Sequence, residues 1–104
     1  MQNQQVINQI RQLLKRVAPE AEVILYGSQA RGDVRKESDI DLLILVNTEE
    51  LTPQYEHKII RALYEVEMLS GIIISPMIMT RKQWENRPFH TPFSINVINE
   101  GIVL

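Results

Sequence analysis

The segment from Ile40 to Val46 constrains the fold of this chain most, because every residue in it except Asp41 is Ile, Leu or Val. A short run of this kind is typical of a central β-strand that is covered on both faces. Asp41 lies between two apolar residues, where an isolated charge would be costly to bury. Asp39 precedes it by two positions, and alternate side chains of a strand point to the same face. We therefore expect the two carboxylates to project together at the start of this strand.

A turn of small residues comes shortly before this pair. The apolar run Val23–Tyr26 predicts a buried strand that ends at Gly27. We expect a short helix from Ser28 to Arg31, with Ser28 as a favourable N-cap and Gly32 as its end. Glycine lets the backbone approach a phosphate closely, and a helix N-terminus supplies unpaired N–H groups. Two carboxylates beside such a turn suit Mg²⁺, which shares its oxygen ligands with substrate phosphates. The combination predicts phosphoryl or nucleotidyl transfer.

The motif Gly27-Ser28-x-x-Arg31-Gly32, followed by Ser38-Asp39-Ile40-Asp41-Leu42, resembles the signature of the minimal nucleotidyltransferases. These proteins are the small members of the DNA polymerase β-like superfamily. The resemblance implies an α/β fold (an α+β sandwich), with a small mixed sheet and helices packed mainly on one face.

The resemblance also implies an activity, a site and a partner. The activity is Mg²⁺-dependent transfer of a nucleoside monophosphate, commonly AMP from ATP, to a hydroxyl of a protein or another acceptor. Gly27, Ser28 and Arg31 would bind the nucleotide, while Asp39 and Asp41 would be the catalytic carboxylates and would hold the metal. Relatives of this size often act as antitoxins, paired with a helical HEPN toxin that is encoded beside them.

One expected feature of an active enzyme is missing. Active members of this superfamily typically place a third carboxylate on a later strand, yet the corresponding segment from Gly71 to Ile78 contains none. Ser75 stands near the expected position, and Glu67 on the preceding helix is a better substitute than Glu65. A residue of a partner protein is the other alternative. Two hypotheses therefore stay open: a nucleotidyltransferase, or a degenerate domain that acts as an antitoxin or binding partner. A P-loop NTPase is excluded, because the Gly-x-x-x-x-Gly-Lys-Ser/Thr motif is absent.

Composition excludes several other classes of protein. The 104 residues predict a single domain over 1–104, and the net charge of −2 argues against direct nucleic-acid binding. Cysteine is absent, which excludes disulfides and cysteine metal sites. The N-terminus does not resemble a signal peptide, and no apolar run approaches the roughly 20 residues that span a bilayer. We therefore expect a cytoplasmic protein without a membrane segment.

The remaining elements follow from apolar spacing and from helix-end signals. Residues 3–17 predict an amphipathic helix that ends before Pro19. Thr52-Pro53 is typical of a helix start and Gly71 of a helix end. A third strand is expected over Ile72–Ile74, with a continuation through Met79 in which Pro76 marks an edge or a bulge. A short helix is expected over residues 80–86 and a last helix over 93–100, before the apolar segment 101–104.

Several side chains are interpreted as structural. Trp84, Phe89 and Phe93 are expected to pack in the core, or to mark a partner surface if they are exposed together. His57 and His90 fit no metal-binding pattern and are expected at the surface. Arg35 and Lys36, in the loop before Ser38, are expected to be solvated.

Overall fold

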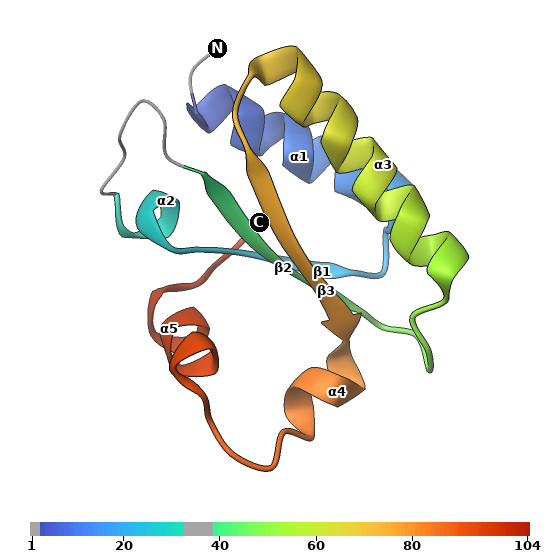
Figure 1. The fold of residues 1–104 in the computed structure, drawn as a ribbon, viewed down its shortest axis with the longest axis vertical. Coiled ribbons are helices and arrows are strands. Elements are labelled where there is room, and N and C mark those ends of the chain that lie inside the picture. The colour runs from blue at the N-terminus through green and yellow to red at the C-terminus, as the bar shows by residue number, and fades with distance from the viewer. Residues whose placement is uncertain (1–2, 33–38) are drawn as a thin grey trace.

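Strand β2 (Ile40–Val46) lies inside a four-stranded sheet of order β3-β2-β1-β4, in a computed structural model that describes residues 3–32 and 39–104 (Figure 1). It pairs antiparallel with β1 (Glu22–Tyr26) and parallel with β3 (Ile74–Thr80). β4 (Ile102–Val103) adds to β1 antiparallel. The mixed sheet confirms the predicted fold class. The expectations for Arg35, Lys36 and Ser38 fall outside the described residues.

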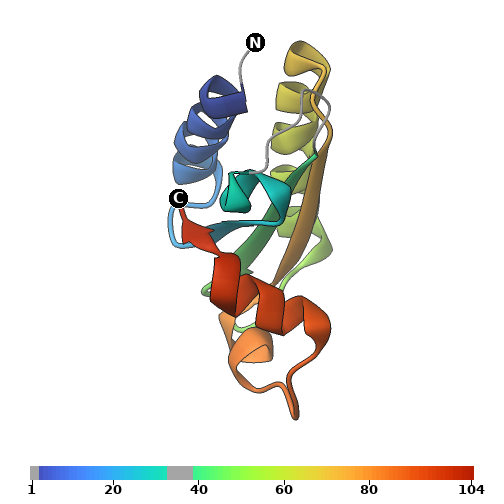
Figure 2. The same cartoon turned by 90° about the vertical axis from the view of Figure 1, so that its left-hand side faces the viewer.

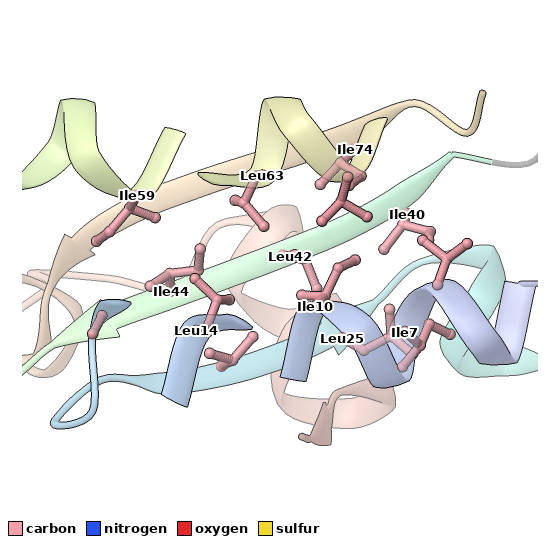
Figure 3. Close-up of a cluster of buried hydrophobic side chains, with 14 of the residues drawn as sticks. Ile7, Ile10, Leu14, Leu25, Ile40, Leu42, Ile44, Ile59, Leu63 and Ile74 are labelled. Atoms are coloured by element: carbon pink, nitrogen blue, oxygen red, sulfur yellow. The ribbon is translucent and has the colours of Figure 1, made fainter. Parts of the chain in front are cut away.

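One face of β2 packs against the two long helices, α1 (Asn3–Val17) and α3 (Pro53–Ser70). Figure 3 shows the side chains of alternate β2 residues pointing into this layer. Because these positions are fully buried and apolar, they form the main core of the described chain. Its labelled members are Ile7, Ile10, Leu14, Leu25, Ile40, Leu42, Ile44, Ile59, Leu63 and Ile74.

The other face of β2 is covered only in part. Leu43 and Leu45 pack in a second, smaller cluster together with Val97 of α5 (Pro92–Glu100). Trp84 of the short helix α4 (Arg81–Glu85) packs against the same cluster. Since side chains alternate along a strand, Asp41 projects on this face. The long helices therefore share one face, as predicted, while the carboxylate lies on the other.

The predicted bounds of α3 are confirmed. The Thr52 hydroxyl accepts a hydrogen bond from the N–H of Tyr55 at 3.2 Å, Pro53 is the first residue, and Gly71 ends the helix at φ 73°. The helices α4 and α5 begin in a similar way, each with a threonine in a capping box. A threonine hydroxyl at this position bonds one of the N–H groups that the first turn leaves unpaired. The α5 helix begins at Pro92, one residue before the expected start.

The C-terminal half also departs from the expected strands. β3 begins at Ile74 rather than Ile72, because the N–H of Ile72 is already bonded to the Ser70 hydroxyl at 3.1 Å. The strand then continues through Pro76 with unbroken register, so this proline marks a sheet edge and not a bulge. The apolar segment after α5, for which no element was predicted, forms β4.

Candidate active site

The turn between β1 and β2 is built around Gly27. Its backbone has φ 75° and ψ −155°, a region that is essentially restricted to glycine. Its carbonyl accepts hydrogen bonds from the N–H groups of Ala30 and Arg31, each at 3.1 Å, which closes the helix α2 (Ser28–Arg31). The prediction that Ser28 caps this helix is wrong. Gly27 occupies the N-cap position, and no side chain makes a capping hydrogen bond to this helix end. Ser28 is the first helical residue, because the chain turns at Gly27 and not at Ser28. Gly32 ends the helix at φ 76°, as predicted.

The carboxylate of Asp41 lies directly against this turn. Asp41 is the register partner of Tyr26, so the residue that follows Tyr26 faces it across the end of the sheet. A Cβ atom on Gly27 would stand 2.5 Å from Oδ2 of Asp41, well inside van der Waals contact. Glycine is therefore needed here for two reasons: the backbone conformation, and the space that the Asp41 carboxylate occupies.

The surroundings of Asp41 disfavour its charge. Burial raises the pKa of Asp41 above its ordinary value of 3.8, the negative charge of Asp39 raises it further, and the cation of Arg31 lowers it. Burial also raises the pKa of the neighbouring Tyr26 hydroxyl, and the Asp41 charge adds to this effect. Burial and the charge of Asp39 thus disfavour the ionised form of Asp41, and a bound cation would favour it.

Ser75 is the register partner of Asp41 on the opposite side from Tyr26. Cross-strand partners project on the same face of a sheet, so a serine stands where a third carboxylate is expected. Glu67 does not replace it. Its Oε1 accepts a hydrogen bond from the N–H of Ile74 at 2.9 Å, and it belongs to α3, which covers the other face. In residues 3–32 and 39–104, no group of three or more His, Cys, Asp or Glu side chains could hold a metal.

Arg31 is held by a residue that the sequence did not single out. Its Nη1 donates to Oε2 of Glu100, the last residue of α5, at 3.0 Å. The two positions are 69 residues apart, so no local pattern could have paired them. On the other side of α2, Nδ2 of Asn3 donates to Oε1 of the buried Gln29 at 3.4 Å. Figure 2 shows α2 between α1 and the end of α5.

The aromatic residues of the C-terminal part separate into two groups. Phe93 packs edge-on against Tyr26, with ring centroids 5.4 Å apart, and against Trp84 at 6.2 Å. Phe89 is 70% exposed. Trp84 and Phe93 therefore pack as predicted, and the three residues do not form one exposed cluster. His57 and His90 are exposed, which confirms their expected place at the surface.

Comparison with known proteins identifies the family. The sequence model of a protein family described as "Nucleotidyltransferase domain" matches residues 7–104. The chain belongs to the nucleotidyltransferase domain family. Two proteins of Methanocaldococcus jannaschii, each named "Putative protein adenylyltransferase", resemble it in sequence. One is 40% identical over 80 residues, which cover 77% of this chain and 74% of the relative. The other is 32% identical over 82 residues, which cover 79% and 75%.

Solved structures support the same fold. A structure described as that of a "putative minimal nucleotidyltransferase" matches with a TM-score of 0.63 and 24% identity, over 100% of this chain and 97% of the other. A toxin–antitoxin crystal structure with AMP-PNP matches with a TM-score of 0.64 and 18% identity, over 92% of this chain and 69% of the other. At these identities the likeness concerns the fold. The family membership supports nucleotidyl transfer in general, with a nucleotide as substrate.

The structure also bears on the membrane expectation. Among the helices of the described ranges, none combines the length and the apolar content that crossing a bilayer requires.

The contact between Gly27 and Asp41 can be tested by adding one methyl group. Gly27→Ala is expected to lower the free energy of unfolding by more than Gly71→Ala does, for two reasons. A Cβ at Gly27 meets the Asp41 carboxylate while a Cβ at Gly71 meets open space, and the Gly27 ψ of −155° is less accessible to alanine than the left-handed helical conformation of Gly71. The αL strain at Gly71 should cost about 1–2 kcal/mol. Urea unfolding of the two variants measures the difference. Equal losses would show that the Asp41 carboxylate does not depend on the glycine.

The electrostatic description of Asp41 predicts a pH dependence. Its pKa is raised in the folded state, so the folded protein binds the proton more tightly than the unfolded chain does. The free energy of unfolding should therefore fall as pH rises from the unfolded value of 3.8 through the folded pKa. Asp41→Asn removes this loss and should unfold at higher urea concentration than the parent at neutral pH.

The pKa itself is measured by NMR titration of the Asp41 carboxyl. Asp39→Asn should lower this pKa, because it removes the like charge, and Arg31→Gln should raise it. A pKa of Asp41 at or below 3.8 in the parent would contradict the description of the site.

Proposed function

We propose that this chain is a Mg²⁺-dependent nucleotidyltransferase that transfers AMP from ATP to a hydroxyl group of a protein or a similar acceptor. One observation carries the proposal: the Asp41 carboxylate lies against the glycine turn that begins α2, with Asp39 two residues before it. Family membership supports nucleotidyl transfer, and the names of the two adenylyltransferase relatives favour AMP and a protein acceptor.

The residues present fit a magnesium ion. Carboxylate oxygens are the ligands that Mg²⁺ prefers, and Asp39 and Asp41 would hold it. The raised pKa of Asp41 supports this assignment, since burial and the nearby Asp39 charge disfavour its ionised form and a bound cation would favour it. When bound, the ion would neutralise the charge that develops on the phosphate oxygens.

The nucleotide would lie over the turn and α2. The first N–H groups of any helix have no partner within that helix, so the start of α2 can donate to phosphate oxygens. The Ser28 hydroxyl adds a donor at the same place, and Arg31 adds a guanidinium. The absence of a side chain at Gly27 leaves room for the Asp41 carboxylate and the phosphates to approach the same turn.

In the reaction, the acceptor oxygen forms a bond to the α-phosphorus while the bond from this phosphorus to the bridging oxygen breaks. The bridging oxygen leaves with the electron pair as part of pyrophosphate. The acceptor hydroxyl loses its proton. Because Ser75 cannot take that proton as a carboxylate could, we propose that a group of the acceptor or of a partner protein does so.

The metal and nucleotide roles are tested by calorimetric titration of Mg·ATP into Asp39→Asn and Asp41→Asn. Each variant should bind about tenfold more weakly or worse, since even residues that only support a metal ligand are worth 10–100-fold. Glu49→Gln, which removes an exposed carboxylate from another region, serves as the control and should bind like the parent. Unchanged affinity in both aspartate variants would remove the proposed site.

A second function is favoured by one observation: Ser75, not a carboxylate, is the strand neighbour of Asp41. A domain that binds nucleotide but does not turn it over could act as the antitoxin or binding partner of a HEPN-type protein. Solved structures of similar fold are described as toxin–antitoxin structures, which supports the proposal that this chain binds a partner protein.

Turnover of labelled ATP separates the two functions. Ser75→Asp should raise adenylyl transfer, because general-base help is worth roughly 10²–10⁴-fold and the position adjoins Asp41. Ser75→Asn, of the same size but without the base, should not. A parent that is already fast, and that Ser75→Asp leaves unchanged, would contradict the need for a third carboxylate. No turnover in any variant, combined with tight binding of a partner protein, would favour the second function.

A further inference from the structure

We propose that Glu100 is a positioning residue that holds the Arg31 guanidinium at the nucleotide site. The inference rests on the proposed function, because it gives Arg31 a phosphate to bind. Its basis is the hydrogen bond of 3.0 Å between Nη1 of Arg31 and Oε2 of Glu100, which joins α2 to the end of α5.

The place of Glu100 in its helix is unfavourable without this partner. Glu100 is the last residue of α5, and the C-terminal end of a helix carries partial negative charge that repels a carboxylate. The Arg31 cation offsets this repulsion. The carboxylate side chain of Glu100 is only 28% exposed, whereas the Arg31 side chain is 47% exposed. The arginine therefore reaches toward solvent while its anchor lies closer to the protein.

The backbone that follows Glu100 packs against β1 and pairs with it. A Cβ on Gly101 would stand 2.7 Å from Cγ2 of Ile24, so the chain passes directly over β1 at this point. The next residues pair with β1 as β4, and the N–H of Leu104 donates to the carbonyl of Val23 at 2.8 Å. The anchor for Arg31 is thus tied to the same strand that leads into the Gly27 turn.

Arg31 is the last residue of the short helix α2, whose N-cap is Gly27. The Asp41 carboxylate lies against Gly27, so the helix that carries Arg31 adjoins the proposed metal ligand. A guanidinium has five N–H donors in a planar fork, and one bond to Glu100 leaves others for a phosphate. The role of Glu100 is to orient this fork, which otherwise ends a flexible side chain on a four-residue helix.

The experiment measures Mg·ATP affinity by calorimetry in Glu100→Gln and in a matched control. Glu85→Gln is the control, because Glu85 also ends a helix and also pairs with an arginine, Arg81, at 3.8 Å. Both variants remove one negative charge. A general charge effect would make both bind the anionic nucleotide more tightly. Positioning predicts the opposite for Glu100→Gln: a loss of roughly two- to fivefold, the range of a single partly exposed ion pair. The control should bind like the parent.

Two further variants test whether Glu100 affects nucleotide affinity through its contact with Arg31. Glu100→Asp keeps the charge but shortens the side chain by one methylene, and it should also weaken binding. In the Arg31→Gln background, Glu100→Gln should cause no additional loss. Thermal unfolding of each variant reports the fold, and a lower midpoint with unchanged affinity would reduce Glu100 to a structural brace and overturn the inference.

The outcomes also separate this inference from the proposed function. If Arg31→Gln weakens binding while both Glu100 variants bind like the parent, the inference fails and the proposed function stands. If the parent does not bind Mg·ATP, or Arg31→Gln has no effect, the nucleotide role of Arg31 fails and the inference fails with it.

Discussion

The burial of β2 on both faces is the constraint on which the rest of the structure depends. Ile40 and Leu42 face the long helices and are fully buried, while Leu43 faces the smaller cluster under α5. Transfer of such side chains out of water is the main favourable contribution to folding. A strand buried in this way has little freedom to shift its register, because a slip of one residue would turn every side chain to the opposite face. The position of Asp41 beside the Gly27 turn is a consequence of that fixed register.

The site is placed where the strand can tolerate a charge. Asp41 lies at the start of β2, on the face that the long helices leave open, and only partly buried. Its raised pKa shows that this position still disfavours the ionised form. A carboxylate kept under these conditions costs stability, and perturbed pKa values of this kind cluster at functional sites. Side-chain hydrogen bonds join α2 to Asn3 on one side and to Glu100 on the other.

Local signals predicted the parts of the fold that depend on neighbouring residues. The Thr52-Pro53 start and Gly71 end of α3 follow from hydrogen bonds within one turn of helix, so they could be predicted from the sequence. The cap of α2 could not, because Gly27 rather than Ser28 occupies it once the chain turns toward β2. β4 was missed for a related reason. Two residues carry no strand pattern, and only their pairing with β1 makes them a strand.

By itself, the sequence determined the chemistry of the candidate site: which carboxylates are present, how far apart they stand in the chain, and which glycine precedes them. Asp41 lies in β2, where alternation sets the face of its side chain, whereas Asp39 immediately precedes the strand. Only the tertiary structure decided what surrounds that pair. It placed Ser75 beside Asp41, bonded Glu67 to Ile74 on the other face, and brought Glu100 to Arg31. These contacts join segments far apart in the chain, and their partners are selected by the packing of helices on the sheet, which no local pattern encodes.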